Sequence, residues 1–281
     1  MKQAKRTIVI LSLALASCRG PVFSPTATPH MLNVRIVATT ATYPLLRDLA
    51  AGYERPGILL AVDSAAASWD TVYGQLIAGD APFALTTYLP SDSGLWAAPI
   101  GLDGIAVIVH PATSIPALTV DDVRRIFLGQ VTTWAELGGT DQPVTVVSRD
   151  SGADTRQVFE ALVLDDREPA HGARLALSSQ SMVAIVARTP GAVGYVSMAH
   201  VTDQVRAMPL SASPGDAAHL PTPETVSQDL YPLRTPVLVT GPEAPGEQSI
   251  YRDWFAWMQS SAGQAVVGQH YGTLAPAPDA P

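Results

Sequence analysis

Residues 101–139 read GLDGIAVIVHPATSIPALTVDDVRRIFLGQVTTWAELGG, an apolar run followed by an amphipathic one. The segment 105–109 has no polar interruption, which is typical of a parallel strand that is covered on both faces. A helix is predicted over 119–128, because Thr119 can cap its first turn and apolar side chains then repeat at helical spacing. Gly129 is placed to end that helix. The stretch therefore predicts one strand–helix unit.

The same alternation continues on both sides of this unit. Further strands are predicted at 34–38, 58–62, 144–147, 192–196 and 237–239. Further helices are predicted at 43–54, 70–78, 154–164, 179–188 and 250–267. Such alternation predicts an α/β protein with mostly parallel sheets, in which ligands bind beyond the carboxyl ends of the strands.

The N-terminal segment has the order of a secretion signal. Three basic residues within the first six precede an apolar stretch, 8–16, which is too short to cross a bilayer of about 30 Å as a helix. The sequence Leu-Ala-Ser-Cys ending at Cys18 resembles the bacterial lipobox, whose cysteine is acylated. A plain cleaved signal with an incidental cysteine is the alternative. We expect a lipoprotein signal peptide at 1–17, a tether at 18–32 and a disordered tail at 275–281.

Composition excludes several function classes. The sole cysteine, Cys18, leaves no intrachain disulfide and no thiol catalysis in the body of the protein. Every basic residue after position 17 is an arginine, so the mature chain has no Walker-type phosphate loop and no Schiff-base lysine. The net charge of −8 argues against a nucleic-acid partner.

An enzyme is not expected, and neither is a metal or another cofactor. No two histidines are spaced three or four residues apart, so there is no local metal motif. No G-x-S-x-G nucleophile elbow occurs. Asp150, Asp154 and the histidines leave a general acid–base site brought together by the fold as the alternative.

Several segments, in this order, resemble phosphate-binding receptors of the phosphate ABC importer. Within 101–139 the resemblance rests on the Ile-Phe-x-Gly and Trp-x-x-Leu-Gly motifs. SRDSGADTRQVFE (148–160) is similar to the family's arginine-acid-x-Gly-Ser-Gly-Thr segment, and TPGAVGYVSMAH (189–200) to its Pro-Gly-Ala-Ile-Gly-Tyr strand. ATTATYPLL (38–46) resembles the first ligand loop. With similar matches toward the C-terminus, the resemblance covers nearly all of residues 33–274.

This resemblance implies a type II periplasmic-binding-protein fold, with two lobes joined by two crossover strands near 110–116 and 197–206. Lobe 1 is expected at 33–112 and 204–274, and lobe 2 at 113–203. The implied protein is a monomeric, lipid-anchored solute-binding protein outside the cytoplasm. It would bind phosphate or a related oxyanion in the interlobe cleft and serve an ABC permease. The same fold binding a small organic ligand, or acting as a sensor without transport, stays open.

The family's ligand residues can be carried over by motif. The resemblance implies that Arg149 and Thr155 bind the anion, since they match the family's arginine and threonine. Thr39 and Thr40 fall on the Ser-Thr positions of the first loop, and Ser68 is the expected hydroxyl donor in the second. Each has a structural alternative: the hydroxyls can serve as helix caps, and Arg149 can form a surface ion pair.

Departures from the family pattern bear on the identity of the ligand. The family's aspartate falls on Thr87, which does not ionise, and its Ser-Gly is Ala153-Asp154 here. We hypothesise that the Asp154 carboxylate turns inward beside Arg149 and replaces the missing acceptor, so that the ligand is a protonated anion such as hydrogen phosphate. Trp69 would favour an organic ligand if its ring faced the cleft.

Overall fold

The computed structural model describes residues 30–54 and 58–275 of the chain. The predicted signal peptide, Cys18 and almost all of the predicted tether and tail lie outside these residues. No helix in the described part of the chain has the length and apolar character needed to cross a membrane.

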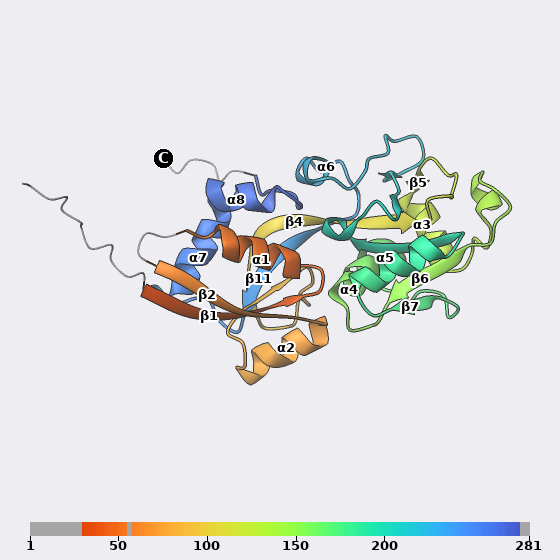
Figure 1. The fold of residues 1–281 in the computed structure, drawn as a ribbon. Coiled ribbons are helices and arrows are strands. Elements are labelled where there is room, and N and C mark those ends of the chain that lie inside the picture. Colours follow the sequence, from red (N-terminus) through yellow and green to blue (C-terminus); the bar gives the residue numbers. More distant parts are fainter. Residues whose placement is uncertain (1–29, 55–57, 276–281) are drawn as a thin grey trace, which may run out of the picture.

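One large sheet runs through the whole molecule (Figure 1). Along this sheet the strands follow the order β2 (Ile58–Ala67), β1 (His30–Thr39), β3 (Ala84–Thr86), β11 (Arg234–Gly241), β4 (Trp96–Val109), β8 (Ala192–Ser197), β6 (Thr145–Arg149) and β7 (Arg174–Ala176). The short strand β9 (Arg206–Ala207) also pairs with β4, and β5 (Leu118–Thr119) pairs with β10 (Leu210–Ser211) as a separate ribbon.

Strand β4 divides the sheet into two halves. Its first part pairs with β11 as far as Gly104, and its second part pairs with β8 from Ile105 onward. We call the half that contains β1, β2, β3 and β11 lobe 1, and the half that contains β6, β7 and β8 lobe 2. In Figure 1 the two lobes lie side by side, and β4 runs from one into the other.

The direction predicted for 105–109 is wrong. All five residues are fully buried, as the sequence indicates, but they pair antiparallel with β8 and β9. Burial on both faces produces an unbroken apolar run in either orientation, and direction is set by how the chain enters the sheet. Here β4 enters lobe 2 directly from lobe 1, as a continuous strand. Parallel pairing is found in β1–β2, β1–β3, β6–β7 and β6–β8.

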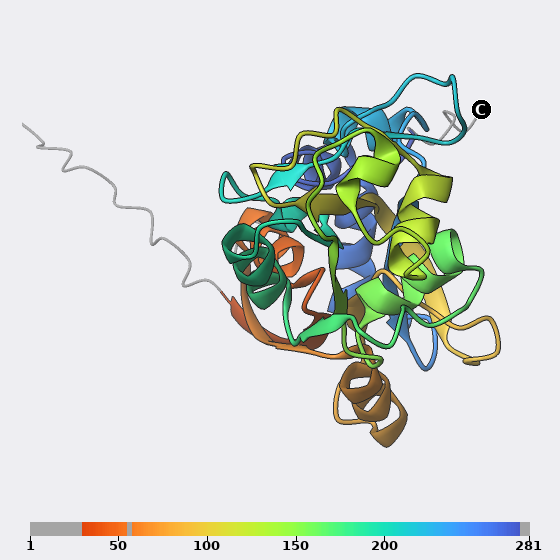
Figure 2. The same ribbon diagram turned by 90° about the vertical axis from the view of Figure 1, so that its right-hand side faces the viewer.

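Helices flank both lobes. Lobe 1 carries α1 (Tyr43–Gly52), α2 (Trp69–Ala78), α7 (Ile250–Gln259) and α8 (Ser261–Val267). Lobe 2 carries α3 (Val120–Phe127), α4 (Asp154–Phe159), which continues as a π-helical turn over Glu160–Leu164, and α5 (Ser179–Arg188). The short α6 (Pro223–Ser227) packs on β4, and α2 projects from the rest of the protein in both views (Figures 1 and 2).

Local sequence signals explain several helix ends. Thr119 caps α3 through a reciprocal pair of bonds with Asp122, as its position predicts. The single helix predicted at 250–267 is two helices, because Ser260 is extended and caps α8 instead of continuing α7. Trp134 is buried and its Nε1 donates to the Gly191 carbonyl oxygen at 3.1 Å, so it belongs to the core of lobe 2.

The lobe boundaries drawn from the sequence stay predictions. In the structure the change of sheet partner lies between Gly104 and Ile105, upstream of the expected crossover at 110–116. On the return path, β9 pairs with the second part of β4 and β10 pairs with β5, and β11 is the next strand of lobe 1.

Candidate functional site between the lobes

Arg149 ends β6 and reaches from lobe 2 to lobe 1. Its side chain is buried, with 1% of the residue exposed. Nε donates to the carbonyl oxygen of Ala176 at 3.1 Å, and Nη1 lies 3.5 Å from the Ser179 hydroxyl. Nη2 lies 3.3 Å from Oγ1 of Thr40, which is on the loop after β1. The guanidinium is thus held in one orientation, with two hydroxyls of opposite lobes at its tip.

Asp154 begins α4 and is also 1% exposed. Its Oδ2 accepts hydrogen bonds from the hydroxyls of Thr39 and of Thr87, the latter at 2.9 Å. Its Oδ1 accepts from the backbone N–H of Thr155 at 2.8 Å and lies 3.2 Å from the hydroxyl of the same residue. The carboxylate of lobe 2 therefore faces the interface and bonds to two threonines of lobe 1.

Burial of this carboxylate requires compensation, because a charge loses hydration when it leaves water. The threonine hydroxyls and the Thr155 N–H supply it, and the position at the start of α4 adds the positive end of the helix dipole. The Asp154 carboxylate is buried at the lobe interface in the structure, while its place beside Arg149 and its role as the ligand's acceptor stay predictions. Thr39 and Thr155, which the family resemblance assigns to the ligand, bond to Asp154 here.

Ser68 does not join this cluster through its own hydrogen bonds. It is the N-cap of α2, where its Oγ accepts from the backbone N–H of Thr71 at 3.4 Å and lies 3.0 Å from the Thr71 hydroxyl. The next residue, Trp69, donates its backbone N–H to the carbonyl oxygen of Gly152 at 2.8 Å, so the start of α2 touches lobe 2.

The ring of Trp69 belongs to the core of lobe 1. It is 5% exposed and packs against Tyr73 and Tyr88, with ring centroids 5.7 and 5.8 Å away. The ring therefore provides no stacking platform in the cleft, and the organic-ligand reading gains no support from this residue.

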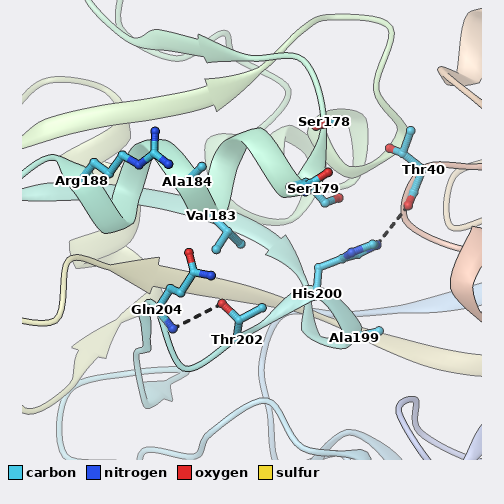
Figure 3. A pocket seen from close by; sticks show the side chains of 11 residues that line it. Thr40, Ser178, Ser179, Val183, Ala184, Arg188, Ala199, His200, Thr202 and Gln204 are labelled. Carbon is cyan, nitrogen blue, oxygen red and sulfur yellow. Dashed lines mark hydrogen bonds between the residues drawn. The ribbon is translucent and has the colours of Figure 1, made fainter.

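His200 forms another contact between the lobes, and the sequence analysis did not predict it as a site residue. Its Nε2 lies 3.0 Å from the backbone carbonyl oxygen of Thr40 (Figure 3). Burial lowers the pKa of His200 below its ordinary 6.5, so the imidazole is neutral at pH 7. Because a carbonyl only accepts, Nε2 carries the proton. Ser179 is the second site residue that the sequence missed, because a serine in the first turn of a helix has no local signal for binding.

A cavity of about 660 Å³ lies next to this cluster (Figure 3). Thr40 of lobe 1 lines it, together with residues of α5 and of the segment that follows β8. Ser179 and His200 are shared between the cavity wall and the contacts just described. The described residues contain no group of three or more His, Cys, Asp and Glu side chains that could hold a metal ion.

These features define a class of protein: two α/β lobes on a shared sheet, with buried arginine, carboxylate and hydroxyl groups where the lobes meet. Residues 24–262 match the family model described as a PBP superfamily domain, and the chain belongs to that family. The solved structures that this chain resembles confirm the α/β fold of the type II periplasmic binding proteins.

Named relatives agree with this assignment. The chain is 35% identical to the phosphate-binding protein PstS of Bacillus subtilis over 126 residues, which cover 44% of this chain and 42% of the relative. A 25% identical structure, the ABC-type phosphate transport receptor from Vibrio cholerae, superposes with a TM-score of 0.68 over 86% of this chain and all of that one. The structure of a substrate-binding protein from Clostridium perfringens, with bound phosphate, superposes with a TM-score of 0.74. It is 24% identical and covers 87% of this chain and all of the other. The chain spans less than two thirds of the length of the PstS relatives that it matches in sequence.

Proposed function

We propose that this protein is an extracytoplasmic receptor that binds phosphate, or a related oxyanion, between its two lobes and delivers it to an ABC importer. The observation that carries the proposal is the buried guanidinium of Arg149, whose tip lies beside hydroxyls of both lobes. The PstS relative and the phosphate transport receptor support the same reading.

An anion bound in this place exchanges its hydrogen bonds to water for hydrogen bonds to the protein. Arg149 offers a planar pair of N–H donors, and Thr40 and Ser179 offer hydroxyls beside its tip. Each bond to a charged group contributes roughly 1.5–3 kcal/mol, so a few such donors offset the desolvation of a small anion. Binding without catalysis is the function that these groups support.

Asp154 determines which anions fit. A carboxylate repels a fully deprotonated oxyanion, but it accepts a hydrogen bond from one that keeps a proton. Hydrogen phosphate keeps one near neutral pH and sulfate does not. The Asp154 carboxylate thereby accepts a hydrogen bond from the proton of the ligand, a role that Thr87 cannot take because it does not ionise. Thr87 instead donates a hydrogen bond to Asp154.

A panel of ligands in a thermal-shift assay on residues 31–281 tests the proposal. Phosphate at 100 times its Kd is expected to stabilise the folded state by about 2.7 kcal/mol, and sulfate by less. A melting temperature that no anion raises would contradict the proposal.

Ligand entry requires the lobes to separate, because Arg149 and Asp154 are each 1% exposed in this closed arrangement. Small-angle scattering is expected to show a smaller radius of gyration with saturating phosphate than without it. An equal radius in both states would argue for a site on one lobe.

The anchor and the partner complete the proposal. We infer that processing leaves an acylated Cys18, so that a monomeric receptor stays on the membrane beside its permease. Mass spectrometry of membrane-extracted protein should find a diacylglyceryl group on Cys18, and an unmodified N-terminus elsewhere would refute the anchor.

A further inference from the structure

The cavity beside Arg149 runs along α5, away from the proposed anion site. It begins at Ser179, whose hydroxyl lies 3.5 Å from Nη1 of Arg149, and it extends to Arg188. These two residues are the ends of α5, so they lie about 13 Å apart at a rise of about 1.5 Å per residue. The cavity thus has one end at the proposed anion site and another well away from it.

Its volume exceeds what one inorganic anion requires. The cavity measures about 660 Å³. A water molecule takes about 30 Å³ in the liquid, and sites for small organic molecules range from about 300 to 1,000 Å³. Phosphate, with four oxygens around one phosphorus, would leave most of this space to solvent.

The charge of the wall is unusual for this chain. The protein carries a net charge of −8, yet none of the eleven described residues that line the cavity is Asp or Glu. Arg188 is one of them, and no ion pair joins it to a carboxylate within the described residues. Since His200 is neutral, the wall combines one cation with polar groups, which favours an anionic ligand over a cationic one.

The uncharged part of the wall indicates the kind of organic group. Gln180, Thr202 and Gln204 offer amide and hydroxyl groups, and in Figure 3 Thr202 and Gln204 lie across from Val183 of α5. Val183, Ala184 and Ala199 add apolar surface between these polar groups. A wall that mixes apolar and polar groups matches an organic group that carries both carbon atoms and hydroxyls.

We propose that this cavity holds the organic part of a phosphomonoester of a small polyol or sugar, whose phosphate lies at the end formed by Thr40 and Ser179, beside Arg149. The inference rests on the proposed function, because it places the phosphate in the same anion site. It makes α5 and the segment after β8 the surfaces that select the ester.

Calorimetry on the purified whole chain tests this, with inorganic phosphate, glycerol 3-phosphate and glucose 6-phosphate as probes. At least one ester should bind as tightly as phosphate or more tightly. Ala184→Phe fills the cavity, so it should raise the Kd of the ester about tenfold or more. The Kd of inorganic phosphate should change by less than about twofold. Ala161→Phe makes the same change at an exposed alanine outside the cavity and should alter neither.

The outcomes separate the two proposals. Phosphate binding with no binding of either ester would overturn the cavity inference and leave the proposed function standing. Equal weakening of ester and phosphate by Ala184→Phe, or no weakening of the ester, would also overturn it. If nothing binds, the proposed function fails and the inference fails with it. Should Ala184→Phe not fold, Gln204→Leu removes a polar group from the wall and gives the same comparison.

Discussion

Replacing Asp154 with asparagine removes one negative charge from the lobe interface and keeps the shape of the side chain. In the structure this carboxylate is 1% exposed and accepts from Thr39, Thr87 and Thr155. Under the proposed function it also accepts the proton of hydrogen phosphate. The variant should therefore bind phosphate more weakly and sulfate more tightly. Sulfate is no longer repelled by the Asp154 charge and loses no hydrogen bond.

The magnitude follows from the lost hydrogen bond. A bond to a charged group contributes about 1.5–3 kcal/mol, and about 1.4 kcal/mol corresponds to tenfold in Kd. Asp154→Asn is thus expected to raise the Kd for phosphate by about 10- to 150-fold. The ratio of phosphate to sulfate affinity should fall by at least that factor. Titration calorimetry with both anions at pH 7 measures both quantities.

Asp150→Asn is the matched control, because Asp150 lies 3.9 Å from Nη2 of Arg149 but is partly exposed and forms no bond to the threonines in the described contacts. This variant removes the same charge close to the site and should change the affinities for phosphate and for sulfate by the same factor. A phosphate-to-sulfate ratio that Asp154→Asn leaves unchanged, or that Asp150→Asn lowers equally, would refute the role assigned to Asp154.

Three further predictions concern stability. Gly191 has φ +78° and an added Cβ would overlap the Pro143 carbonyl oxygen, so Gly191→Ala should cost about 2 kcal/mol or more, seen as a lower melting temperature. Gly74 lies inside α2 with open space around it, and Gly74→Ala should instead stabilise by about 0.5–1 kcal/mol. Burial raises the pKa of Asp103 on β4 from 3.8 to about 7, so the folded state binds the proton more tightly than the unfolded state. Asp103 should therefore make stability fall as pH rises from about 4 to about 7, and urea unfolding of Asp103→Asn should lack this contribution.

The sequence predicted the elements that are long enough to carry a pattern. Six strands and the main helices lie where apolar runs and helical spacing put them, because burial imposes that spacing. Strands of two or three residues, such as β5 and β9, leave no period to detect. The antiparallel pairing of β4 could not be predicted either, since both faces of a buried strand are apolar whatever its direction.

For the site, motif order gave candidate residues, and the fold shows which of them lie together. Asp154 stood out because a carboxylate replaced a glycine of the family motif. Its bond to Thr39 joins residues 115 positions apart, which no local pattern encodes. Ser179 and His200 reach the site only because α5 and the turn after β8 pack beside Arg149. The position of Trp69 in the core shows that a residue within a ligand loop can still face inward.

The central claim is that Arg149 binds an anion between the lobes, and calorimetric titration of phosphate into the unmodified protein, Arg149→Ala and Arg35→Ala tests it most directly. Arg35 is a half-exposed surface arginine of lobe 1, so its variant removes the same charge away from the cleft. We expect the unmodified protein and Arg35→Ala to bind phosphate with similar Kd values and a correctly folded Arg149→Ala to give no binding heat. Phosphate binding by Arg149→Ala with a Kd within about threefold of the unmodified protein would contradict the account.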